Sequence, residues 1–111
     1  MIRHFYSHII ETDSIVLELE TLDISKNEKS HLIEIMESSI HLSVMDSILS
    51  ELPKEHRKAF LFHVNEKQHE QVWKIINGTI KDAQNMILKS AGMVKKEFLA
   101  DIKKLKSEAK K

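Results

Sequence analysis

The sequence predicts a small all-α bundle, because apolar side chains return every three to four residues along most of the chain. Glycine and proline are scarce, with 2 and 1 in 111 residues, which leaves few turns for a many-stranded sandwich or barrel. The composition, 41% hydrophobic and 31% charged, is typical of a folded chain that dissolves in water. We therefore expect one helical domain over residues 1–111, with frayed ends at 1–12 and 106–111.

The start of the central helix is encoded at Ser25, three residues before Glu28. This spacing is a capping box, in which the serine oxygen accepts a hydrogen bond from a free backbone N–H and the glutamate reaches back. Apolar residues then recur up to Leu52, and Pro53 ends the run because proline clashes with the preceding turn. The pattern predicts a long helix over about 26–52, with an apolar face wide enough for more than one neighbour.

Two short helices and a second long helix are expected after Pro53. Proline suits the first turn of a helix over 54–64, and Asn65 is expected to cap a helix over 66–77 that stops at Gly78. From 79 to 108 the apolar residues recur about every 3.6 residues, which predicts a long terminal helix beside the central one. Before residue 25 we expect a short helix, since a single strand would have no partner.

The apolar positions of these helices predict the centre of the bundle. The residues expected there are Ile40, Val44, Ile48, Leu52, Phe60, Val64, Trp73, Ile76, Ile87, Val94 and Phe98. Two short helices cover a pair of long ones incompletely, so part of the apolar surface of the long helices is expected to remain open to a partner helix.

Charge is divided between the two halves of a chain that is formally neutral. Residues 1–52 hold three basic and ten acidic residues, whereas residues 74–111 hold ten lysines and four acidic residues. Halves of opposite sign attract each other, within one molecule or between two. The basic end can also neutralise phosphates without reading a base sequence, which makes non-specific nucleic acid an alternative partner. The lysines expected to do so are Lys95, Lys96, Lys103, Lys104, Lys106, Lys110 and Lys111.

Two Glu-x-x-His pairs, Glu28 with His31 and Glu66 with His69, are the main candidates for a metal centre, since His4 and His8, four residues apart, lack a third ligand at suitable spacing. On helices this spacing puts a carboxylate and an imidazole on one face, and two such helices with further carboxylates form a two-metal site. Both pairs are expected in first helical turns at the ends of the bundle. Solvated surface pairs are therefore the favoured interpretation, and metal binding is the second alternative.

The residue inventory disfavours an enzyme. The chain has no cysteine, so it has no disulfide, thiolate metal site or cysteine nucleophile. Two glycines cannot build a phosphate-binding loop, and the many serines of the central helix fit close helix contact better than nucleophilic catalysis. The sequence shows neither a membrane-spanning apolar run nor a secretory signal. We expect no catalytic activity, no cofactor, no membrane partner and a cytoplasmic location.

The stretch from Asp46 to Glu55, the pair Phe60-Leu61 and the segment His69 to Trp73 together resemble a family of small all-helical bacterial proteins of unknown function. The similar part covers residues 25–77. The family has no assigned activity and no catalytic residues to carry over, so the resemblance implies the fold and leaves the function open. From the sequence we expect a helical module for protein interaction or self-association, with a homodimer as one form.

Overall fold

The computed structural model describes the chain over residues 4–109, with the side chains of residues 4–105. In this part of the chain it contains five α-helices and a short 3-10 helix, η1, and no strand. The elements are η1 (Ser7–Ile9), α1 (Asp13–Glu20), α2 (Lys26–Glu51), α3 (Lys54–Asn65), α4 (His69–Thr79) and α5 (Ala83–Ala109). The predicted all-α bundle, with two long helices and two short ones between them, is confirmed.

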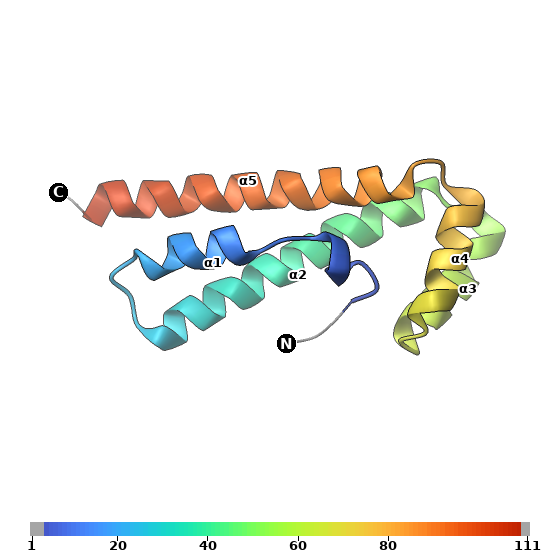
Figure 1. The fold of residues 1–111 in the computed structure, drawn as a ribbon, viewed down its shortest axis with the longest axis horizontal. Helices are drawn as coiled ribbons and strands as arrows, with labels where there is room; N and C mark the ends of the chain where they lie inside the picture. The colour runs from blue at the N-terminus through green and yellow to red at the C-terminus, as the bar shows by residue number, and fades with distance from the viewer. Residues whose placement is uncertain (1–3, 110–111) are drawn as a thin grey trace.

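The long helices α2 and α5 lie side by side and antiparallel along a molecule of 54 × 23 × 19 Å (Figure 1). At one end α1 packs against both of them and completes a three-helix section. At the other end α3 and α4 form a helical hairpin that lies across the long axis (Figure 1). The segment before α1 runs back toward this hairpin, so the N-terminal residues connect the two ends.

The core follows the predicted apolar stripes, although some expected members lie at its edge. The side chains of Ile40, Val44, Ile48, Leu52, Phe60, Ile76 and Ile87 are buried, whereas Val64, Trp73, Val94 and Phe98 are partly buried against them. Met36, Val72, Ala91 and Ile102 are buried on the same helix faces. Phe5 and Tyr6, each only 3% exposed, belong to the core without having been predicted there.

The expected fraying over residues 1–12 stays a prediction, and the structure packs Phe5, Tyr6, Ile9 and Ile10 at the core. Phe5 and Tyr6 are buried, and the Glu11 carboxylate accepts a hydrogen bond of 2.7 Å from the backbone N–H of Ser14 at the start of α1. That N–H lowers the pKa of Glu11, and the Ser14 hydroxyl and Lys95 lower it further. Residues 1–3 and the side chains of 106–111, which the same prediction covers, lie outside the described part.

The helix ends show which boundaries can be predicted from neighbouring residues in the sequence and which cannot. As predicted, Ser25 caps the start of α2, and its Oγ accepts a hydrogen bond of 3.1 Å from the backbone N–H of Glu28. The predicted boundary at Asn65 is wrong, because α3 includes Asn65 and the chain turns at Lys67, whose φ is 58°. A residue with positive φ cannot continue a right-handed helix, so α4 begins later, at His69.

The predicted stop at Gly78 is also wrong, because α4 continues through Gly78 to Thr79. The Thr79 hydroxyl donates a hydrogen bond of 2.7 Å to the carbonyl of Ile75, and the next side chain, Ile80, is buried. The turn is made instead by Asp82, with φ of 58°. Aspartate tolerates this conformation because its short polar side chain bonds locally, and here the Asp82 carboxylate accepts hydrogen bonds from the Asn85 amide.

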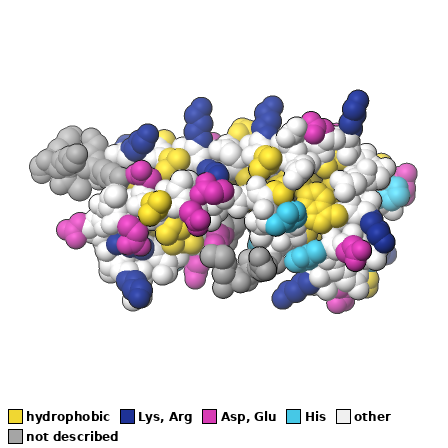
Figure 2. Space-filling model, viewed as in Figure 1, with side chains coloured by type: hydrophobic (Ala, Val, Ile, Leu, Met, Phe, Trp, Pro, Cys, Tyr) yellow, Lys and Arg dark blue, Asp and Glu magenta, His cyan; other side chains and the backbone are white. Residues whose placement is uncertain are grey.

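Lysines of α2 and α5 form ion pairs with acidic residues of α1 and of the segment just before it. Lys29 of α2 lies 3.4 Å from the Glu20 carboxylate, and Lys95 of α5 lies 3.8 Å from the carboxylate of Glu11. Other lysines stand along the α5 edge of the molecule (Figure 2). Within the described residues, no helix is both long and apolar enough to cross a membrane.

Candidate functional site

The most apolar open surface of this size is a groove between α2 and α5, here called the α2/α5 groove, with a volume of about 320 Å³. The spacing of the α2 residues, at 32, 35 and 39, puts them on one helix face, and α5 presents a matching face. Two apolar side chains at the groove, Ile35 and Leu105, are 46% and 47% exposed. The groove is lined by Leu32, Ile35, Ser39, Val94, Glu97, Phe98, Asp101, Ile102 and Leu105.

The position of the groove follows from the helix arrangement. Its lining residues all come from α2 and α5, and none comes from α1, which packs on the same two helices. A pair of antiparallel helices with a third helix on one side leaves another side open. Leu42, seven residues after Ile35 and therefore on the same side of α2, is 70% exposed and extends the apolar strip.

The groove carries charge only at Glu97 and Asp101 of α5, both exposed. These residues are four apart, so their carboxylates lie on one side of the helix. The remaining lining is apolar apart from Ser39. A surface of this kind binds another helix by burying apolar area, with charged groups at its rim.

A second feature is the aromatic–histidine cluster, which consists of His4, Phe5, Tyr6, His41, Phe60 and Trp73. The Phe5 ring makes edge-on contacts with Phe60 and Trp73, at centroid distances of 5.9 and 5.8 Å. The indole N–H of Trp73 donates a hydrogen bond of 2.9 Å to the backbone carbonyl of Phe5. Residues of α3 and α4 thus hold the segment that precedes α1.

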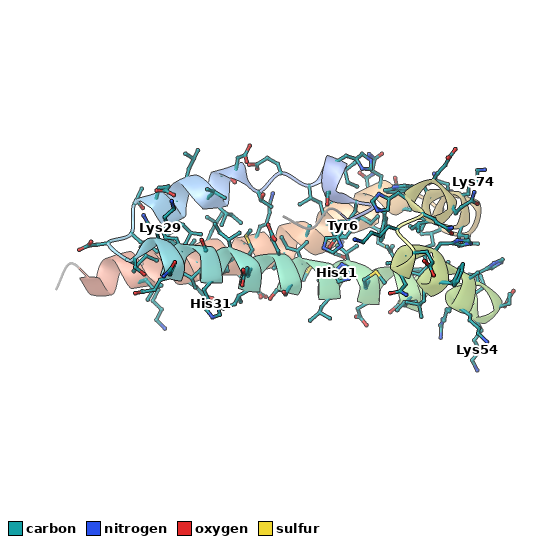
Figure 3. The ribbon with its side chains drawn as sticks, turned by 90° about the horizontal axis from the view of Figure 1, so that it is seen from below. Tyr6, Lys29, His31, His41, Lys54 and Lys74 are labelled. Carbon is teal, nitrogen blue, oxygen red and sulfur yellow. The ribbon has the colours of Figure 1, made fainter. Side chains whose placement is uncertain are left out.

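The same segment is bonded to α2 through His41. Nδ1 of His41 lies 2.9 Å from the Tyr6 hydroxyl, and the two side chains point toward each other (Figure 3). The His4 ring stacks on the ring of His41 at 4.2 Å and on that of Tyr6 at 5.1 Å. Burial lowers the pKa of both imidazoles, and for His4 the neighbouring His41 and His69 lower it further. Burial, and then the Glu37 carboxylate, raises the pKa of Tyr6.

The structure does not bring the two Glu-x-x-His pairs together. Glu28 and His31 lie in the first turns of α2, near the α1 end, and His31 points away from the bundle (Figure 3). Glu66 and His69 lie at the α3–α4 turn, where His69 shares a hollow with His4; the ring of His4 stacks on His41, which is ten residues, about 15 Å, along α2 from His31. A joint two-metal site is therefore not formed within one chain. No group of three or more His, Cys, Asp or Glu in the described residues is placed to hold a metal ion.

The predicted phosphate-binding lysines have different roles. Lys95 donates a hydrogen bond of 2.5 Å to the backbone carbonyl of Glu11, so it helps to hold the start of α1. Lys96, Lys103 and Lys104 are exposed on α5. The side chains of Lys106, Lys110 and Lys111 lie outside the described part of the chain.

The aromatic–histidine cluster was missed by the sequence analysis. His41 directly follows Ile40 of the α2 stripe, and Phe5 with Tyr6 forms an aromatic pair in a chain with only 5% aromatic residues. These two features single out His41, Phe5 and Tyr6 as candidates for burial, but neither feature indicates that His41 and Tyr6 contact each other. Their contact joins positions 35 apart in the sequence.

Comparisons with known proteins leave both features to be interpreted from their own geometry. No protein-family model, no curated protein and no solved structure matches the chain. The family resemblance over residues 25–77 accordingly stays a prediction.

Proposed function

We propose that the protein is a non-catalytic helical interaction module that self-associates, with the α2/α5 groove of each copy receiving the other copy. The observation that carries the proposal is the open apolar groove in the three-helix section, where α1 already covers another side of the same helix pair. A fourth apolar surface placed there completes a helical bundle. Because the interface in a symmetric dimer is the same patch on both copies, one groove supplies both halves.

Charge favours a second copy as the occupant. The α2 helix holds two lysines and five acidic residues, a formal charge of −3, whereas residues 83–105 of α5 hold five lysines and two acidic residues, a charge of +3. A two-fold axis parallel to the helices puts α2 of one copy beside α5 of its partner, so that helices of opposite net charge lie side by side, while the groove itself carries only the carboxylates of Glu97 and Asp101. The alternative axis, perpendicular to the helices, puts α2 against α2 and is disfavoured by repulsion.

The proposed dimer predicts which side chains contribute to association. Ile35 and Leu105 become covered in the dimer, and each contributes twice because the contact is symmetric. A charge introduced at Ile35 would be buried without a partner, which strongly opposes association. Leu88, 42% exposed on α5 and absent from the groove lining, is a matched control position.

Light scattering coupled to gel filtration tests the proposal at about 50 μM protein, where a dimer with micromolar affinity is populated. We expect twice the chain mass of 12.9 kDa for the wild type and for Leu88→Glu, and the single-chain mass for Ile35→Glu. Circular dichroism confirms that each variant is folded. A monomeric wild type, or an Ile35→Glu protein that remains dimeric, contradicts the proposal.

A second candidate function, non-specific nucleic-acid binding, is supported by the exposure of Lys96, Lys103 and Lys104 on one helix. Such binding weakens steeply with salt because phosphate contacts release counterions. We expect Lys103→Gln/Lys104→Gln to reduce binding to a duplex at low salt, with Lys54→Gln at the far end of the molecule as the control. Absence of binding by the wild type at low salt rules this candidate out.

A further inference from the structure

The hairpin of α3 and α4 is joined to the rest of the molecule by its chain connections to α2 and α5, by buried side chains such as Ile76 in the shared core, and by the N-terminal segment. The extensive helix packings are those of α2 with α5, of α3 with α4, and of α1 with both long helices. Neither hairpin helix packs extensively on α2 or α5. Residues 4–10, here called the strap, contact both parts, because Phe5 is held by Phe60 and Trp73 while Tyr6 is held by His41.

The strap is held at α2 by neutral histidines. The rings of His4 and His41 lie 4.2 Å apart and are inclined by 22°, a stacked arrangement. Two neutral imidazoles tolerate this distance, whereas two imidazolium ions at the same distance repel each other in a partly buried site. Protonation of His41 at Nδ1 also removes the acceptor that this atom can offer to the Tyr6 hydroxyl.

The charged and titratable groups around this stack come from three elements. On α2, Glu37 lines a small hollow with His4 and Tyr6. On α4, His69 and Glu70 line a second hollow with His4, and His8 of the strap lies in the same hollow. The carboxylates favour protonation of the imidazoles and His69 opposes it. Burial and the other histidines nonetheless dominate, since the pKa of His4 lies below its ordinary value of 6.5.

We infer that the strap is an acid-sensitive latch: it ties the α3/α4 hairpin to α2 while His4 and His41 are neutral, and it detaches when they take up protons. The released strap uncovers the aromatic surface of Phe60 and Trp73, against which the Phe5 ring packs in the attached state. The inference goes beyond self-association, because no strap or hairpin residue lines the α2/α5 groove.

The pH range follows from linkage. When the strap is detached, His4 of the strap and His41 of α2 are expected to have the ordinary pKa of 6.5, and when it is attached the pKa of each is lower. Attachment is therefore complete above 6.5 and weakens as the pH falls from 6.5 toward the lowered values. The ratio of detached to attached strap rises by at most about tenfold per pH unit for each histidine.

Trp73 is the only tryptophan of the chain and reports directly on the strap, because its indole donates to Phe5. We expect its emission maximum to shift to longer wavelength as the pH falls from about 7.5 to about 5, the range over which histidine titrates. The wavelength is measured instead of the intensity, because the intensity also depends on rings close to the indole, such as that of His8 at 5.7 Å.

The variant His4→Phe/His41→Asn keeps a ring at position 4 and a hydrogen-bonding amide at position 41, and neither side chain titrates. We expect this variant to lose the acid shift, and the control His31→Asn, at an exposed position of the same helix, to keep it. A wild type with no shift, or a double variant that shifts like the wild type, overturns the inference.

Hydrogen exchange of the wild type tests the latch without relying on correct folding of the double variant. After correction for the intrinsic pH dependence, amides of residues 4–10 should lose protection at about pH 5. The α2 amides around Val44 should stay protected. Equal loss in both regions means global unfolding and overturns the latch, whereas continued protection of the strap also overturns it.

Discussion

The two ends of the molecule are held together in different ways. In the three-helix section, Ile15, Leu19, Met36 and Ile102 are each at most 2% exposed, and the packing is aliphatic. At the hairpin end the rings of Phe5, Tyr6 and Phe60 are buried beside aliphatic side chains such as Val72 and Ile76, and the contacts include the directed bonds from Trp73 and between Tyr6 and His41. Aliphatic packing is non-directional and carries no protons. Directed bonds to imidazoles make the hairpin end sensitive to pH. One small bundle therefore combines a section whose packing does not depend on histidine protonation with a section whose packing does.

Removal of one buried side chain from each end gives the largest expected effects. Phe60→Ala should lower the free energy of unfolding by about 3–5 kcal/mol and Met36→Ala by about 2–5 kcal/mol, because each leaves a cavity in the core. Urea denaturation followed by circular dichroism measures both. Only Phe60→Ala should also expose the amides of residues 4–10 to exchange in the folded protein. Protection of the strap in Phe60→Ala would mean that the aromatic contacts do not hold it.

The contact between α2 and α5 contains a hydrogen bond at a position between the two ends of the molecule. The hydroxyls of Ser47 and Ser90 lie 2.6 Å apart, and Ser90 is 8% exposed. Either serine replaced by alanine leaves its partner without this bond, at a cost of about 1–3 kcal/mol, whereas the double replacement should cost less than the sum. A double-mutant cycle in urea measures the difference. Strictly additive losses of unfolding free energy would show that the hydrogen bond between the two hydroxyls does not stabilise the contact between α2 and α5.

The starts of α1 and α2 provide a matched pair of caps. Ser25→Ala should destabilise the protein by about 1 kcal/mol, because the serine oxygen caps α2. Thr12→Ala should change stability by less than about 0.5 kcal/mol, since the Thr12 side chain makes no cap bond and Glu11 bonds the first turn instead. Thermal unfolding of the two variants measures the contrast, and equal losses would contradict it.

Small gains in stability, instead of losses, are expected at the two helical glycines. Neither Gly78 nor Gly92 has a positive φ, and a Cβ at either position meets nothing within 4 Å. Each glycine replaced by alanine should therefore stabilise the protein by about 0.5–1 kcal/mol. The free energy of unfolding measures this gain. A loss at Gly78 would instead support the left-handed stop that the sequence predicts there.

Much of the helical framework was predictable because its signals are local. The capping box at Ser25, the apolar spacing after it and the break at Pro53 lie within one stretch of chain, and α2 begins and ends within one residue of the prediction. The later turns were misplaced. Positive φ at Lys67 and Asp82, together with burial of Ile80, depends on how the hairpin packs, and a residue such as Gly78 that permits a turn does not require one.

The candidate site was predictable only in outline. An apolar surplus on the long helices was expected, but which part remains open depends on where α1 lies. The two Glu-x-x-His pairs had suitable spacing, and the structure still does not bring them together. His41 was overlooked because a single histidine beside an apolar stripe gives no indication of its partner.

Periodicity and capping by themselves determined that this chain forms helices, which helices are long and which faces they bury, because those properties depend on residues within a few turns of one another. Only the tertiary structure decided that Phe5 meets Trp73, that His41 meets Tyr6 and that one side of the α2 and α5 pair stays uncovered. The reason is physical: these contacts join residues up to 68 positions apart, and their formation depends on the packing of the whole chain.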